Sequence, residues 1–368
     1  MKISINKEAL LKPLTYVVGI VEKRQTLPIL GNVFIKSISN DLTIIGTDLE
    51  TEITTFVKKI DSEDGEITVA ARKLFDIVRS MPDEAIINLT VEQDNKVVVA
   101  SGRTRFTLQT LPAKDFPKLD VNNWDSEFSV SRSDLSSLLA STQFAMAQQD
   151  VRYFLNGLLF EIEPGVLRTV ATDGHRLARS EIAVSGIEAS GIQRIVPRKA
   201  VLEMQRFLSS EESGEVKIQI NANHISVSTE QLIFQSKLID GRFPDYNSVI
   251  PSNLTKHLEV ERTGLIDILV RAAILSNEKF KGISLLLESG LLKVSSNNPE
   301  QEQASDEMAV DYNGDSVEVG FNVNYVLDAL RNLATEKVVL GLQDANTSCT
   351  IKSPNIETTL YLIMPMRL

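Results

Sequence analysis

Acidic side chains placed directly after short apolar strands are the residues of this chain that could most readily do chemistry. Asp48 and Glu50 follow the segment LTIIGT, and Asp173 follows LRTVAT. Carboxylate oxygens gathered at strand ends can bind Mg²⁺, and His175, two residues beyond Asp173, has the chemistry of a general base. These residues raise the hypothesis of a metal-dependent hydrolase.

The spacing of these carboxylates argues against hydrolysis. Asp48 and Asp173 lie 125 residues apart (173 − 48), and Asn298 follows after another 125 (298 − 173). The two aspartates are therefore equivalent positions of a repeat, in different domains, and are not expected to share one metal ion. No partner is spaced so that His175 could activate a nucleophile. We expect no catalytic residues, no metal site and no cofactor.

Three further features recur at the same interval, which is near one third of the 368 residues. An alternating strand that runs into a helix begins at Lys2, Phe128 and Leu258. A second helix begins at Ala71, Pro197 and Asn322, and a closing strand runs into Pro117, Pro244 and Pro365. A period this long indicates a triplicated domain rather than a solenoid repeat. Turn residues near 118–127 and 251–257 then place the domains at 1–122, 123–252 and 253–368.

Within each copy, most segments alternate polar and apolar residues with the period that is typical of strands, separated by Asn, Asp and Gly turns. Two segments per copy have helical periodicity instead; in the first, Leu10, Leu14 and Val17 share one face. Pro13 lies inside that helix, so a kink or a late start is expected, and Pro197 is expected at the first position of another helix. The predicted architecture is α+β, with about eight antiparallel strands and two helices packed on one side in each copy.

The net charge hides an uneven distribution. The chain has 38 Lys and Arg against 49 Asp and Glu, a net charge of −11 and a pI near 5.0, which excludes a uniformly basic nucleic-acid-binding protein. Six predicted helical segments carry 16 basic and 9 acidic residues (+7), so the remainder carries −18 (−11 − 7). These segments are 7–24, 71–80, 131–148, 197–208, 261–281 and 322–334.

Because the apolar stripes of these helices must face the sheets, their charges are expected to face away from them. A solvated helix face is commonly rich in Lys, Arg and Glu, which is the simpler interpretation. The acidic strands and loops favour a second one, in which the helical side attracts a polyanion. Duplex DNA carries one charge about every 1.7 Å, and the helices lack a pattern of Arg, Asn and Gln for reading base edges. A sequence-independent DNA contact is therefore expected.

Composition limits the remaining alternatives. Cys349 is the single cysteine, which precludes an intrachain disulfide, and the three histidines are His175, His224 and His257. The segment MKISINKEAL has no apolar stretch of the kind found in signal peptides, and no run approaches the ~18 apolar residues of a membrane span. A cytoplasmic protein without membrane contact is expected.

Several sequence blocks, spread over all three copies, resemble the bacterial sliding clamps, the beta subunits of DNA polymerase III. The blocks are LPILGN from Leu27, QDVRY from Gln149, VATDGHRL from Val170, DGRFPDY from Asp240, AILSNEKF from Ala273, GFNV from Gly320 and MPMRL from Met364. The resemblance implies a head-to-tail homodimer that forms a ring of six similar domains, with the helices lining a central hole. Such a ring is a processivity factor for DNA replication: it encircles double-stranded DNA, tethers the polymerase and is not an enzyme.

The resemblance also implies a groove between the second and third domains that receives a short peptide with Leu and Phe anchors. Its partners would be the catalytic subunit of the replicative polymerase, the clamp loader and other proteins with the binding motif, such as repair polymerases. The matching positions are Leu155, Thr172, Gly174, His175, Arg176, Leu177, Pro244, Val249, Leu362, Met364, Pro365, Met366 and Arg367. Methionine is adaptable and suits a groove used by several partners, whereas Ser248 stands where many relatives carry a basic residue. The alternative is that these apolar residues merely complete a sheet.

For DNA, the resemblance implies contacts from the helices and from loops beside them. The matching positions are Arg24, Arg72, Lys73, Gln149, Tyr153, Phe154, Arg198 and Lys199, with Arg152 and Arg242 less closely matched. Phe154 replaces a frequent Tyr, so it can stack on a base but cannot donate a hydrogen bond. The third copy has Asn322 and Asn324 in place of the Arg-Lys pair. A scaffold that never meets DNA is the alternative.

The resemblance further implies a ring interface in which an edge strand of one protomer meets the third domain of the other. On the strand the residues are Arg103, Arg105, Phe106 and Leu108, and on the third domain they are Ile274, Leu275, Glu300 and Glu302. The apolar residues would pack together and the arginines would face the glutamates. An edge strand needs pairing or protection, so an exposed Phe106 would be a liability in a monomer. The alternative is that Phe106 is an ordinary core residue.

Overall fold

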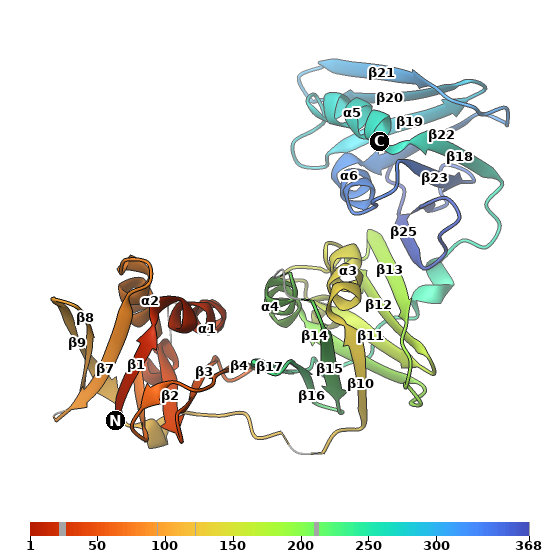
Figure 1. Cartoon of the computed structure of the whole chain (residues 1–368). Coiled ribbons are helices and arrows are strands. Elements are labelled where there is room, and N and C mark those ends of the chain that lie inside the picture. Colours follow the sequence, from red (N-terminus) through yellow and green to blue (C-terminus); the bar gives the residue numbers. More distant parts are fainter. Residues whose placement is uncertain (22–26, 94, 122, 210–212, 368) are drawn as a thin grey trace. The chain divides into compact units, whose positions relative to one another are not determined.

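The computed structural model describes residues 1–21, 27–93, 95–121, 123–209 and 213–367 (Figure 1). These residues form two compact units, Met1–Ser133 with Leu202–Leu238 (unit 1) and Asp134–Val201 with Ile239–Leu368 (unit 2). Both units combine helices with antiparallel sheet, which confirms the predicted α+β class. None of the helices in the described ranges has the length and apolar composition of a membrane-spanning segment.

Within the described residues, two α-helices occur in each third of the chain, as the periodicity predicts. They are α1 (Lys7–Ile20), α2 (Ala71–Ser80), α3 (Arg132–Gln143), α4 (Arg198–Leu208), α5 (Arg262–Ala273) and α6 (Val323–Arg331). The late start expected from Pro13 is wrong, because α1 begins at Lys7, where the Asn6 side chain caps it by accepting a hydrogen bond from Glu8 N at 3.0 Å. Pro197 is the last residue of the preceding strand and not the first residue of α4.

Helices α3 and α5 are shorter than the apolar periodicity predicts. They end at Gln143 and Ala273, whereas the predicted segments extend to 148 and 281. After α5, the Ser276 hydroxyl donates back to Ala273 O at 2.7 Å and closes the last turn. Ile274 continues the apolar pattern in the sequence, but its side chain is 75% exposed. After α5 the apolar pattern therefore continues onto the surface, whereas after α3 it continues in the buried residues Ala145, Met146 and Ala147.

Among the residues that the structure describes, successive thirds contain nine, eight and eight strands, which confirms the predicted count of about eight. The first third has β1 (Lys2–Asn6), β2 (Asn32–Ile38), β3 (Asp41–Thr47), β4 (Thr51–Val57), β5 (Asp61–Ser62), β6 (Gly65–Ala70), β7 (Ile86–Glu92), β8 (Lys96–Ser101) and β9 (Thr104–Leu111). The second has β10 (Ser126–Ser131), β11 (Gly157–Glu163), β12 (Val166–Thr172), β13 (Arg176–Ala183), β14 (Ile192–Pro197), β15 (Glu215–Ile220), β16 (His224–Ser228) and β17 (Leu232–Lys237). The third has β18 (Lys256–Glu261), β19 (Gly282–Glu288), β20 (Leu291–Asn297), β21 (Gln303–Ala309), β22 (Val317–Asn322), β23 (Lys337–Leu342), β24 (Cys349–Lys352) and β25 (Thr359–Ile363).

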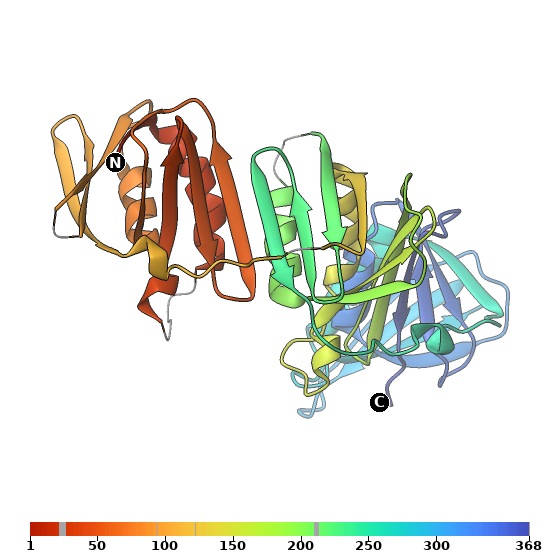
Figure 2. The same cartoon turned by 90° about the horizontal axis from the view of Figure 1, so that it is seen from below.

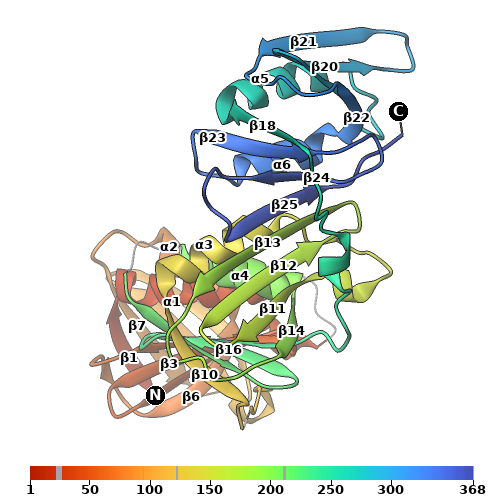
Figure 3. The same cartoon turned by 90° about the vertical axis from the view of Figure 1, so that its right-hand side faces the viewer.

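Strand pairing joins neighbouring thirds of the chain. Unit 1 has one sheet in the order β10-β15-β16-β17-β4-β3-β2-β6-β9-β8-β7-β1-β5, in which β17 pairs with β4 (Figure 2). Unit 2 has the sheets β14-β11-β12-β13-β25-β24-β23-β18 and β21-β20-β19-β22, and β13 pairs with β25 (Figure 3). The second third is divided between the units because each of its sheets continues into a neighbouring third.

The apolar faces of the helices pack on these sheets. Helix α1 lies on β3 and β4, and α5 lies on β20 and β21. Leu10, Leu14 and Val17 are completely buried, as their shared helical face predicts. The burial of this face accounts for the stability of α1 more than helix propensity does, since Pro13 interrupts its hydrogen bonding.

A cation at the first position of the first helix in each third binds the end of the second helix. The bonds are Lys7 Nζ to Met81 O (2.6 Å), Arg132 Nε to Leu208 O (3.2 Å) and Arg262 Nη1 to Leu330 O (3.4 Å). Carbonyl groups at a helix C-terminus carry partial negative charge, so the contact is favourable. These three cations are used inside the fold, and the positive surface predicted from the helices is correspondingly smaller.

Candidate functional site

The turn between β12 and β13 is rigid because its own side chains satisfy its backbone. Thr172 Oγ1 donates to Arg176 O at 2.6 Å and accepts from Gly174 N at 3.0 Å. Asp173 Oδ1 accepts from the amides of His175 and Arg176 at 2.9 and 3.1 Å. Gly174 has a φ of +89°, a conformation that favours glycine. The Asp173 carboxylate is therefore engaged in the turn, which leaves the hydrolase hypothesis without its central ligand.

Arg176 ties this turn to helix α6 and to the segment that follows α3. Its Nε donates to Asp173 Oδ2 at 3.0 Å, its Nη1 to Asp328 Oδ2 of α6 at 2.6 Å, and its Nη2 to Phe144 O at 2.7 Å. The guanidinium carbon also lies 4.7 Å from the ring centroid of Tyr325. Only 12% of the Arg176 side chain is exposed. Arg176 is thus a positioning residue that fixes β13 against α6, with all three guanidinium nitrogens used.

An apolar cluster lies beside the turn and includes four of the predicted groove residues. Leu155, Leu177 and Leu362 are buried, and Met364 packs against them while remaining partly exposed. The other buried members are Ala147, Leu159, Val170, Ile195, Phe243 and Tyr246, and Phe154, Ile239 and Ile250 are partly exposed. The arrangement gives an apolar floor with partly exposed apolar side chains around it.

The C-terminal segment is held along the edge of this cluster. Strand β25 ends at Ile363, and the Met364 amide then donates to His175 O at 2.9 Å. Met366 N donates to Gly320 O, also at 2.9 Å. Two separate main-chain bonds therefore fix a segment that would otherwise be expected to fray, and they place Met364 next to the β12–β13 turn.

Pro244 and Val249 border the cluster less directly than the sequence predicts. Both are exposed, and they lie on the segment that carries the buried side chains of Phe243 and Tyr246. Arg367 is exposed as well. The structure thus brings Leu155, Leu177, Leu362 and Met364 into mutual contact, and it places the other predicted groove residues in the turn, the tail and the segment around Tyr246.

Charged residues beneath the cluster were missed by sequence reasoning. Tyr246 Oη donates to Glu161 Oε2 at 2.8 Å, and Arg168 binds Glu161 on one side and Glu181 Oε2 at 2.7 Å on the other. Burial raises the pKa of Glu161, but the bonds from Tyr246 and Arg168 outweigh it and hold that pKa below its usual range. The signal was present in the sequence, since opposite charges at paired positions of adjacent strands stabilise a sheet.

Arg152 supports the turn, although the sequence suggested a DNA contact for it. Its Nε donates to Asp150 Oδ1 at 3.0 Å and its Nη2 to Asp173 O at 3.1 Å. The hydrogen bonds that the Arg152 side chain and main chain donate to Asp150 lower the pKa of that carboxyl to about 2. A Cβ at Gly174 would lie 2.9 Å from the Arg152 guanidinium nitrogens, and this flexible side chain would have to shift to make room for it.

The predicted DNA-contacting residues differ in their exposure and in their hydrogen bonds within the chain. Arg72 Nη2 donates to Val21 O at 2.9 Å and Arg198 Nη1 to Met146 O at 3.1 Å, so each arginine uses part of its charge on the main chain. Arg72, Lys73, Gln149 and Tyr153 are exposed, and Phe154, Arg198 and Lys199 are partly exposed. Arg24 lies outside the described residues.

The predicted interface residues lie on strand β9 and the turn before it, in the loop before β21, and directly after helix α5. Strands β8 and β9 pair from Lys96 opposite Gln109 to Ser101 opposite Thr104. Strand β9 pairs with β6 only at Thr110 and Leu111. In the described sheet, β21 pairs with β20 alone. Arg105 and Phe106 of β9 are exposed, as are Arg103 in the turn before β9 and Glu300 and Glu302 in the loop before β21. Leu108 and Leu275 are partly exposed. Arg105 already donates to Glu92 Oε1 at 2.7 Å within its own chain.

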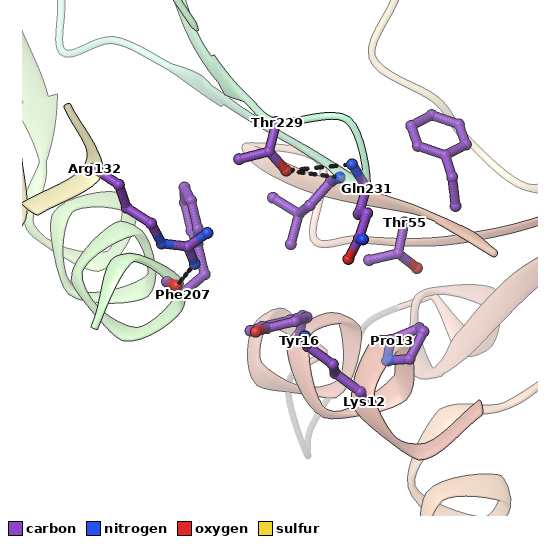
Figure 4. A pocket seen from close by; sticks show the side chains of 10 residues that line it. Lys12, Pro13, Tyr16, Thr55, Arg132, Phe207, Thr229 and Gln231 are labelled. Atoms are coloured by element: carbon purple, nitrogen blue, oxygen red, sulfur yellow. Dashed lines mark hydrogen bonds between the residues drawn. The ribbon is translucent and has the colours of Figure 1, made fainter. Parts of the chain in front are cut away.

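A cavity of about 40 Å³ lies in unit 1 (Figure 4). Lys12, Pro13 and Tyr16 of α1 line one side, and Arg132 with Phe207 lines another. Its volume is that of one or two water molecules. None of the site residues predicted from the sequence lines it, so it is separate from the apolar cluster.

Three family models match consecutive parts of the chain. They describe the N-terminal, central and C-terminal domains of the DNA polymerase III beta subunit and match residues 1–120, 129–245 and 247–367. The chain is 48% identical over 369 residues to the beta sliding clamp of Pseudomonas aeruginosa and 46% identical over 369 residues to that of Escherichia coli, covering 100% of each chain.

Solved structures agree with the family models. The crystal structure of the DNA polymerase III subunit beta from Pseudomonas aeruginosa matches with a TM-score of 0.97 at 48% identity, covering 100% of both chains. A sliding clamp from the same organism bound to griselimycin matches equally well, with a TM-score of 0.97, 48% identity and 100% of both chains covered. The similarity therefore extends over all three thirds of the chain.

Proposed function

Since the chain belongs to the DNA polymerase III beta subunit family, whose members are DNA sliding clamps, we propose that two copies close head to tail into a ring around duplex DNA. The chain acts in DNA replication as a clamp and is not an enzyme. Each copy contributes three domains, 1–122, 123–252 and 253–368. Enclosure itself holds such a ring on DNA, so its contacts to phosphates stay few and allow sliding.

The ring closes where the edge strand β9 of one protomer meets β21 and the end of α5 of the other. Unpaired backbone groups along both edges support this pairing, because an exposed edge invites another strand. Phe106 is 37% and Ile274 is 75% exposed in the single chain, and burying them removes apolar surface from water. Arg103 and Arg105 approach Glu300 and Glu302 in this arrangement. The contact is heterologous and closes because each chain spans half a turn.

The helices carry the contacts to DNA. Lys73 and Lys199 occupy equivalent positions in α2 and α4. Tyr153, next to Phe154 in the sequence, is 56% exposed. Arg72 and Arg198 contact DNA through the guanidinium N–H groups that do not bind main-chain carbonyls. Arg24 and Gln149 are the remaining contact residues. Contacts of this kind read phosphates and not bases, so the ring holds any sequence.

The apolar cluster of unit 2 is the floor of the groove that binds partner peptides. The observation that carries this assignment is the bond from Met364 N to His175 O, which fixes the tail beside the turn over Leu177 and Leu362. Leu and Phe side chains of a peptide add apolar contacts to this floor, and Met364 adapts to different anchors. The partners are the polymerase catalytic subunit, the clamp loader and repair polymerases with the same motif.

Tethering through this groove raises the effective concentration of the polymerase at the primer end. Primer extension on a long single-stranded circle tests this function, with the polymerase catalytic subunit, the clamp loader and ATP present. Addition of the chain is expected to lengthen severalfold the products that the polymerase makes in one binding event on the template. Equal product lengths with and without it would contradict the proposal. Because the DNA that it serves lies in the bacterial cytoplasm, we place the chain there.

A further inference from the structure

The turn between β3 and β4 repeats the hydrogen bonds of the turn between β12 and β13, 125 residues earlier in the chain. Thr47 Oγ1 donates to Thr51 O at 3.0 Å and accepts from Leu49 N at 3.1 Å. Asp48 Oδ1 accepts from Glu50 N at 2.9 Å and from Thr51 N at 2.6 Å. Leu49 has a φ of +77° at the position of the glycine in the later turn. Unit 1 therefore contains the same rigid turn as the groove.

The segment that follows the neighbouring strand is also held in the same way in both places. Lys237 N donates to Glu50 O at 2.8 Å in unit 1, as Met364 N donates to His175 O at 2.9 Å in unit 2. The strands next to each turn agree too, since β17 pairs with β4 as β25 pairs with β13. The first repeat thus holds a structural copy of the groove.

The apolar floor is conserved in position between the two copies. Phe34, Ile45 and Phe116 form a buried cluster in unit 1, with Ile29 and Ala113 packed against it. At the equivalent positions, the groove cluster has Leu159, Val170 and Phe243. The deepest part of the first-repeat copy is therefore as apolar as that of the groove.

The two copies differ at the side chains above this floor. Glu52 of β4 pairs with Thr47 of β3. At the equivalent position of the groove, Leu177 of β13 pairs with Thr172 of β12. The strand partner of Glu52 is Gln235, and that of Leu177 is Leu362. A carboxylate and an amide thus replace the two leucines that a peptide anchor would contact.

Glu52 is held in place by its own surroundings. It is 5% exposed, and its Oε2 accepts a hydrogen bond from Leu119 N at 2.9 Å. Lys118 Nζ lies 3.9 Å from the ring centroid of Phe34 and covers part of the apolar floor. An apolar anchor placed here would remove the remaining water from a carboxylate without replacing its hydrogen bonds, which is unfavourable.

We propose that Glu52 and Gln235 close the first-repeat copy of the groove to apolar peptide anchors, so that each chain offers one peptide site. This inference rests on the proposed groove in unit 2. The two residues act as specificity determinants through what they exclude, since the turn, the strand pairing and the apolar floor of the groove are all repeated here. The exchange Glu52→Leu with Gln235→Leu is then expected to open that site.

Isothermal titration of the intact dimer with a short peptide carrying Leu and Phe anchors tests the inference. The unaltered chain is expected to bind one peptide per chain. The Glu52→Leu, Gln235→Leu chain is expected to bind two, with the new site at least tenfold weaker than the first. A folded variant that still binds one peptide overturns the inference, whereas an unaltered chain that binds none overturns the proposed groove instead.

Two further variants test the inference if the Glu52→Leu, Gln235→Leu chain does not fold. Leu177→Glu with Leu362→Gln transfers the closed pair into the groove and is expected to abolish peptide binding there. Glu52→Gln preserves the shape and the acceptor for Leu119 N but removes the charge. With this variant, a photoactivatable peptide is expected to cross-link to residues 112–121, and Glu50→Gln, at an exposed neighbour, is the matched control. Absence of this cross-link in folded Glu52→Gln protein also overturns the inference.

Discussion

The guanidinium Nη1 of Arg176 lies 2.6 Å from Oδ2 of Asp328, so an ion pair joins strand β13 to helix α6 beside the groove. The two residues are 152 positions apart and belong to the second and third thirds of the chain. Arg176 also binds Asp173, which sits in the turn that accommodates the tail. The geometry of the groove therefore depends on a contact between two repeats and not on either repeat alone.

Arg176→Ala is expected to lower both stability and peptide affinity. The substitution leaves two carboxylates without their cation, and the lost charged hydrogen bonds correspond to about 2 kcal/mol of unfolding free energy. Urea denaturation checks the first effect and peptide titration the second. Lys217→Ala is the control, because its ion pair with Glu127 has partners 45% and 51% exposed, and such pairs contribute under about 1 kcal/mol. Equal losses in both variants would contradict the positioning role.

Removal of residues 364–368 is expected to abolish partner binding while the dimer remains intact. The truncation removes Met364 and its bond to His175 but leaves strand β25 and both sheet edges in place. Peptide titration measures the first outcome and sedimentation velocity the second. Loss of the dimer in this truncation would count against the separation of groove and interface.

Ile274→Ala combined with Leu275→Ala is expected to give monomers. The two side chains supply apolar surface at the proposed interface, and Ile274 is 75% exposed in the single chain, so its truncation costs little within the fold. Sedimentation velocity reports the change directly. Ile356→Ala, at another exposed isoleucine, is the control and is expected to leave the dimer unchanged. An unaltered sedimentation coefficient in the double variant would refute the interface.

Asp150 is expected to stay ionised down to about pH 2, because Arg152 donates to its carboxylate from both side chain and main chain. Its folded pKa lies below the unfolded value of about 3.9. The contribution of this pair to stability is therefore complete above pH 4 and is lost as the pH falls from about 4 towards 2. NMR titration of the side-chain carboxyl checks the value. In Arg152→Gln the pKa should return towards 3.9, and a pKa that does not move would show that Arg152 is not the cause.

Repeat spacing predicts much of this fold from the residues alone. Helix α2 begins at Ala71 and ends at Ser80, as its periodicity indicates, because Ala71, Leu74 and Val78 form one buried face. The prediction fails for α5, where Ile274 continues the helical pattern but serves a surface. Apolar periodicity measures which side chains avoid water and does not distinguish a core from an interface that a second chain covers.

The site was harder to predict than the fold. Leu155, Leu177, Leu362 and Met364 were identified through a family resemblance, and the structure brings them together. The Arg176 to Asp328 ion pair left no signal in the sequence, since long-range pairs of single side chains have no periodicity. For Lys7, Arg132 and Arg262 the sequence predicts charges on a DNA-facing surface, but their side chains bind helix ends instead.

Retention on DNA before and after linearisation tests enclosure most directly. The dimer is loaded onto a nicked circle with the clamp loader and ATP, the free protein is removed, and one restriction cut opens the circle. A ring held by topology is expected to remain on the circle at high salt and to leave the linear molecule through its ends. Equal retention on circular and linear DNA, or loss from both as salt rises, would show that binding and not encirclement holds the protein, and would contradict the account.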